Sequence, residues 1–161
     1  TGSSSGTNIS GSLRLASNLP INSFISIIDN NTQDPALQVG ASRGAPQLLL
    51  SSSTNVGVFS TKLVILNLGS INAVASVRAR DNITGEQIGQ VTGLQIPPNG
   101  FLQIDDIIGD LGLGNSFGSL EIYSQTVQPI LCVALITSTE GTGGFLVAAP
   151  VDLPLAEFGG L

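Results

Sequence analysis

Two patterns of apolar residues run along the chain, and both are typical of β-strands. In residues 73–80 every second side chain is apolar, namely Ala73, Ala75, Val77 and Ala79. A period of two places these four on the buried face of a strand and Val74, Ser76, Arg78 and Arg80 on a wet face. Residues 63–66 and 130–136 are continuous apolar runs instead. They predict central strands, or strands covered on both faces.

Short turn signals separate these strands. Residues 81–85 (Asp-Asn-Ile-Thr-Gly) predict a hairpin loop, and residues 97–100 (Pro-Pro-Asn-Gly) predict a turn that also blocks sheet pairing. Residues 141–144 (Gly-Thr-Gly-Gly) lack the lysine and the helix of a phosphate loop and predict another hairpin turn. Residues 105–112 predict one helical turn that begins at aspartates and ends at Gly112. Strands at this spacing predict an all-β sandwich of two antiparallel sheets.

An internal repeat suggests how the chain is organised. Residues 11–17 (GSLRLAS) are followed by Pro20, Ile21 and an apolar strand, and residues 118–124 (GSLEIYS) are followed by Pro129, Ile130 and another. We therefore expect a flexible Gly/Ser arm over residues 1–10, an additional N-terminal β-hairpin over 11–44, a sandwich module over 45–153 and a C-terminal tail over 154–161. Residues 11–44 are alternatively the end of a preceding module or extra strands of one enlarged sandwich.

Three segments, residues 62–70, 94–106 and 118–122, resemble the immunoglobulin-like β-sandwich repeats strung along large bacterial secreted and cell-surface proteins. The likeness covers roughly residues 46–150, with residues 11–44 as a second, partial copy. It implies an immunoglobulin-like antiparallel sandwich that serves as a non-catalytic module in a tandem array or surface appendage. It supplies no active-site residues.

The residue types present exclude much catalytic chemistry. The chain has no histidine, which excludes histidine-dependent triads and histidine zinc sites. Lys62 is the only lysine, and at the head of an apolar strand it is better explained as a solubilising charge than as half of a Ser–Lys dyad. The single cysteine, Cys132, lies in an apolar run and is predicted to be a core residue. We expect no enzyme and no cofactor.

The weak candidates for a metal site are Asp105, Asp106 and Asp110. Calcium needs six or more oxygen ligands, and their spacing matches no known loop, so helix capping and solvation explain them better. A sugar platform is also poorly supported, because aromatic residues make up only 4% of the chain. The glycan acceptor patterns at Asn8, Asn30 and Asn82 are explained by chance in a chain this rich in Asn, Ser and Thr.

The charge and the hydropathy of the chain limit the classes of partner that it can have. A net charge of −6 argues against nucleic acid as a partner. Mean hydropathy is +0.38, yet no apolar run reaches the roughly 18 residues that span a bilayer. The abundance of Gly, Ser, Thr and Asn is typical of extracellular or cell-surface β-modules. We expect the apolar excess to be buried in an assembly as well as in a core.

The resulting hypothesis is a structural subunit of an extracellular filament or surface array, a homopolymer or tandem neighbour of its own fold, joined by strand or hairpin exchange. Alternatives are an accessory spacer or adhesion module, and a calcium- or glycan-binding sandwich that uses the loops at residues 29–34 or 105–110. Arg14 occupies in one repeat copy the place of Glu121 in the other, so the two are expected to pair across a subunit contact. The predicted donor is the arm over residues 1–10, and the predicted acceptors are edge strands around residues 13–17 and 145–149. The predicted assembly interface comprises Thr7, Asn8, Ile9, Leu13, Arg14, Leu15, Glu121, Phe145 and Val147.

Overall fold

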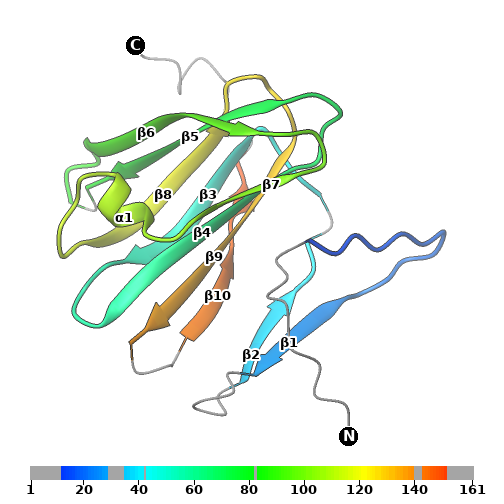
Figure 1. Cartoon of the computed structure of the whole chain (residues 1–161), viewed down its shortest axis with the longest axis horizontal. Coiled ribbons are helices and arrows are strands. Elements are labelled where there is room, and N and C mark those ends of the chain that lie inside the picture. The colour runs from blue at the N-terminus through cyan, green and yellow to red at the C-terminus, as the bar shows by residue number, and fades with distance from the viewer. Residues whose placement is uncertain (1–11, 29–34, 42, 82, 140–142, 152–161) are drawn as a thin grey trace, which may run out of the picture.

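The computed structural model describes residues 12–28, 35–41, 43–81, 83–139 and 143–151. Within them, two antiparallel sheets pack as a sandwich, accompanied by one short helix and a separate N-terminal sheet of two strands (Figure 1). The predicted all-β sandwich with a helical turn and an additional hairpin is thus confirmed at this level. No helix in the described ranges is long and apolar enough to cross a membrane.

One layer of the sandwich is a five-stranded sheet in the order β11-β3-β8-β5-β6. Its strands are β3 (Gln47–Thr54), β5 (Ala73–Arg80), β6 (Gln87–Ile96), β8 (Phe117–Ser124) and β11 (Ala149–Pro150). The other layer is a four-stranded sheet in the order β10-β9-β4-β7. Its strands are β4 (Phe59–Asn67), β7 (Phe101–Ile104), β9 (Ile130–Ser138) and β10 (Gly143–Val147). The two apolar runs of the sequence form β4 and β9, the central strands, as predicted.

Aliphatic side chains and alanine build the core between the layers. From the five-stranded sheet, Leu50, Leu120 and Ile122 point inward, and from the four-stranded sheet Leu63 and Ile65 meet them. The alternation in β5 correctly predicts its inward face, where Ala73, Ala75, Val77 and Ala79 are buried. The wet outer face predicted for β5 is wrong in part, because Ser76 and Arg78 are also buried. Tyr123 and Gln125 lie against them and exclude water.

The strands pair in a nested order. β5 pairs with β6, β4 pairs with β7, and β3 pairs with β8, all antiparallel. Each pair encloses the previous one along the chain, as in a long hairpin that has been rolled into two layers. The next pair outward would join β9 to the strand before β3. In this chain β10 occupies the place beside β9 instead.

Local chemistry fixes the turns where the sequence predicts them. At the β5–β6 turn the Asp81 carboxylate accepts the backbone N–H groups of Ile83 and Thr84, which lowers the pKa of Asp81. Residues 97–100 carry the chain from β6 in one sheet to β7 in the other, and Asn99 takes a left-handed φ of 56° there. Helix α1 (Ile107–Asp110) begins at the N-cap Asp106, and Gly112 follows it with a φ of 74°.

The separate sheet is a hairpin of β1 (Phe24–Ile28) and β2 (Pro35–Val39). It falls within the predicted span of 11–44, but of the repeat only the apolar strand after Pro20 and Ile21 is formed, as β1. Residues 118–124 form β8, whereas residues 12–17 form no strand and are exposed, so the prediction of a strand there is wrong. β8 is paired on both sides, by β3 and β5, while residues 12–17 have no partner strand. Similar sequence therefore gives different structure, because sheet neighbours decide strand formation.

Candidate assembly surfaces

The hairpin presents one strongly apolar face. In its register Phe24 lies opposite Val39 and Ser26 opposite Leu37, so these side chains and Ile28 share a face. Phe24, Ile28, Leu37 and Val39 are between 58% and 71% exposed. We call this face the hairpin patch (Phe24, Ser26, Ile28, Leu37 and Val39). Four large apolar side chains on one small exposed face are typical of a surface that binds a partner.

The hairpin lies beside the edge strand β10 but outside both sheets of the sandwich (Figure 1). No ladder of hydrogen bonds joins β2 to β10 in the described part of the chain. The N–H of Ala148 bonds to the C=O of Cys132, and antiparallel ladders alternate. The backbone groups of Phe145 and Val147 therefore point away from β9, toward the edge. This edge remains able to pair with another strand.

The outer face of the four-stranded sheet is largely apolar. The register aligns Lys62, Leu135 and Phe145 in one row across the strands, and Val64, Val133 and Val147 in the next. Most of these side chains are half-buried. We call this surface the sheet patch (Val64, Leu66, Leu131, Val133, Leu135, Phe145 and Val147). Its neighbour Lys62 forms an ion pair with Asp105 at 2.9 Å, so the unpaired charge on this side is small.

The outer face of the five-stranded sheet is polar and internally bonded. The Arg80 Nε donates to the Glu121 Oε1 at 2.6 Å. The amide of Gln90 donates to the Tyr123 hydroxyl at 2.8 Å, and the Arg78 guanidinium lies 4.8 Å from the centroid of the Tyr123 ring. The sequence does not reveal this network, because its members lie on three strands that pair only in the folded chain.

The predicted interface residues divide into three groups. Thr7, Asn8 and Ile9 lie outside the described residues. Leu13, Arg14 and Leu15 are exposed in a segment without a strand, so they are not the predicted sheet edge. Glu121 pairs with Arg80 of its own chain, and the expected pairing with Arg14 across a subunit contact stays a prediction.

Phe145 and Val147 do lie on an edge strand, β10, and both side chains belong to the sheet patch. Both residues therefore belong to the edge strand that contacts β2 of the hairpin.

The three aspartates near α1 have separate local roles. Asp105 binds Lys62 and accepts from Gln103, and the pKa of Asp105 is lowered chiefly by the Lys62 contact. Asp106 caps the helix by accepting from the N–H of Gly109. Asp110 lies in the single turn of α1. No group of three or more His, Cys, Asp or Glu residues that could hold a metal ion occurs in the described ranges.

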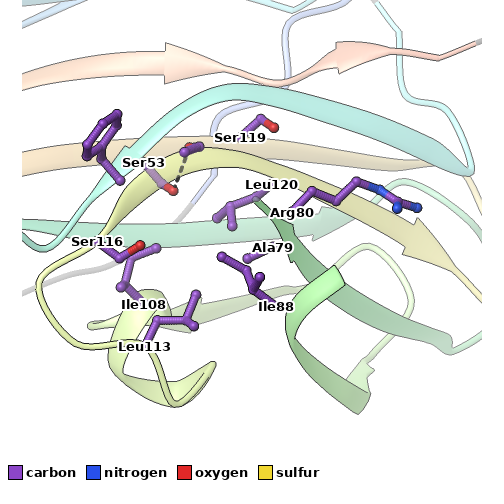
Figure 2. Close-up of a pocket in the computed structure, with 11 residues that line it drawn as sticks. Ser53, Ala79, Arg80, Ile88, Ile108, Leu113, Ser116, Ser119 and Leu120 are labelled. Atoms are coloured by element: carbon purple, nitrogen blue, oxygen red, sulfur yellow. Dashed lines mark hydrogen bonds between the residues drawn. The ribbon is translucent and has the colours of Figure 1, made fainter. Parts of the chain in front are cut away.

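Neither Cys132 nor the small cavity beside α1 offers a reactive site. Cys132 is fully buried in β9, as predicted for a core residue, and burial raises the pKa of its thiol above the usual range. The cavity measures about 10 Å³ and lies between α1 and strands β5, β6 and β8, where Ile88, Ile108 and Leu120 line it (Figure 2). That volume holds at most one water molecule.

Comparison of the chain with protein-family models, curated proteins and solved structures found no match. The function must therefore be argued from these surfaces alone.

Proposed function

We propose that the protein is a non-catalytic structural subunit of an extracellular filament or surface array, assembled by exchange of the β1–β2 hairpin between neighbours. One observation carries the proposal: the hairpin stands outside the sandwich with its apolar patch exposed. A hairpin of two strands is marginal by itself in water and gains stability when an apolar face is covered. A neighbouring copy supplies that cover.

The nested strand order supports exchange. β2 precedes β3, so the pattern that joins β3 to β8 would place β2 beside β9. β10 lies beside β9 instead, and no ladder of hydrogen bonds joins β2 to β10 in the described residues. Moving the hairpin to another copy therefore breaks no inter-sheet ladder. Exchange of an identical element between copies is a low-cost route to assembly.

We further propose that the sandwich is a double-sheet jelly roll in place of the immunoglobulin-like arrangement that the resemblance implied. In immunoglobulin domains the first two strands share a sheet. Here β3 and β4, the first two strands of the sandwich, lie in different sheets. Nested pairs of strands divided between two layers are the pattern expected of a jelly roll.

Composition supports the extracellular setting. Gly, Ser, Thr and Asn are abundant, charged residues are only 10% of the chain, and the sheet patch is apolar. A surface of this kind is stable against aggregation only when something covers it.

The test replaces Leu37 and Val39 with threonine, which keeps β-propensity but removes apolar surface from the hairpin patch. The control replaces Ile71 and Ile83, which are 56% and 89% exposed outside the hairpin. Sedimentation velocity and electron microscopy should show assemblies of the wild type and of the control. The Leu37→Thr/Val39→Thr variant should stay monomeric and should melt at the midpoint that the wild type shows at concentrations too low for assembly. A wild type that is monomeric at every concentration would refute the proposal and favour an accessory spacer module.

A further inference from the structure

An open apolar groove of about 410 Å³ lies at the end of β10, lined by Phe59, Ile136, Gly143, Gly144, Phe145 and Leu146. Two consecutive glycines of β10 help to keep it open. A Cβ added at Gly144 would meet no heavy atom within 4 Å. Phe59, on the far side of β9, is 43% exposed although it is the first residue of a central strand. The groove therefore exposes aromatic and aliphatic surface that the sandwich itself does not cover.

The lining chemistry restricts what can occupy the groove. Small-molecule sites of this volume combine apolar walls with a few converging polar side chains. The described lining residues here contribute only aromatic, aliphatic and glycine positions. These described residues favour an apolar occupant, because a charge placed against them would lose its hydration.

The hairpin of a second copy meets both conditions. β1 and β2 read Phe-Ile-Ser-Ile-Ile and Pro-Ala-Leu-Gln-Val and contain no charged residue. Each copy carries a net charge of −6, so two copies repel each other except where uncharged surfaces meet. The groove and the hairpin patch are such surfaces. In a single copy they do not cover each other, because the hairpin patch stays exposed.

We propose that this groove binds the hairpin patch of a second copy. This proposal rests on the proposed function and identifies the surface that the hairpin contacts. The contact joins two different surfaces of the same chain, so it is head-to-tail. Repetition of a head-to-tail contact that does not close yields an open filament.

The decisive variant is Gly144→Leu, which fills the groove with a side chain that has room in the folded chain. Its matched control is Gly114→Leu, because Gly114 also has open space around its Cβ and lies in the connection between α1 and β8. We expect Gly144→Leu to raise the concentration required for assembly by at least about tenfold while the melting midpoint stays unchanged. Gly114→Leu should assemble as the wild type does.

If Gly144→Leu assembles like the wild type, the groove is not the receptor, although assembly through the hairpin still stands. If the wild type does not assemble, the proposed function itself fails.

Cysteine cross-linking decides the matter independently of whether Gly144→Leu folds. In a Cys132→Ala background, Leu37→Cys and Phe59→Cys are made in two chains of different length and mixed under mild oxidation. We expect a mixed disulfide dimer, because a hairpin bound in the groove of another copy brings the two new cysteines together. Assemblies that form no mixed disulfide, or that cross-link Leu37→Cys equally well to Leu49→Cys on the opposite layer, would overturn the proposal.

Discussion

The two outer faces of the sandwich differ in chemistry although both belong to antiparallel sheets of similar size. The five-stranded sheet carries a bonded polar network around Tyr123, Arg80 and Glu121. The four-stranded sheet carries the aliphatic sheet patch and one ion pair at its margin. An outer face that meets only water alternates with polar residues, as the first face does in part. The second face has the composition of a surface that is covered in the functional state.

The largest effect is expected when a charge is removed from the polar outer face of the five-stranded sheet. Arg80→Met leaves the half-buried Glu121 carboxylate without its cation. We expect the free energy of unfolding to fall by about 1–3 kcal/mol, since a charged group that loses its partner away from water is costly. Urea denaturation at neutral pH measures it. Arg43→Met, which removes an exposed charge, should cost much less, and equal losses in the two variants would show that the pair contributes nothing.

A substitution on the apolar face should act on assembly and hardly on folding. Val133→Thr keeps the shape and β-propensity of a half-buried side chain. We expect the free energy of unfolding to change by less than about 1 kcal/mol, whereas the concentration required for assembly rises. Sedimentation and urea denaturation on the same sample separate the two effects. A large loss of stability without a change in assembly would mean that this face is simply part of the monomer.

The smallest effect is expected at the margin of the sheet patch, where Lys62 binds Asp105. Because the pKa of Asp105 is lowered in the fold, chiefly by Lys62, the pair stabilises the protein above the unfolded pKa of about 3.9. That contribution is lost as the pH falls through the lowered pKa. Asp105→Asn should therefore melt slightly below the wild type near neutral pH, and the two midpoints should converge at about pH 2. A difference that persists in strong acid would point to another role for Asp105.

Local signals in the sequence were sufficient for the turns, the helix and the central strands. The hairpin loop after Asp81 and the cap at Asp106 depend on neighbouring residues only, so their positions could be predicted. The apolar run that contains Cys132 can be shielded from water only in a buried strand, so its position could also be predicted. The edge position of Phe145 and Val147 was also predicted.

What failed depends on partners distant in the sequence. Leu13 and Leu120 lie in matching repeat copies, yet only Leu120 has strands on both sides and becomes buried. The ion pair of Glu121 with Arg80 was also missed, because the two residues lie on strands that become neighbours only in the folded chain. The groove depends on how β4, β9 and β10 end together, which no local pattern records.

The nested strand order also sets the sequence in which the chain can acquire structure during synthesis. The paired residues Phe24 and Val39 are close in the sequence. Leu48 and Ile122 are much farther apart in the sequence, and so are Lys62 and Leu135. Closure over such long loops is entropically costly and slow. The first two strands can therefore pair while the rest of the newly made chain is still open, but a lone two-stranded hairpin stays marginal until its apolar face is covered.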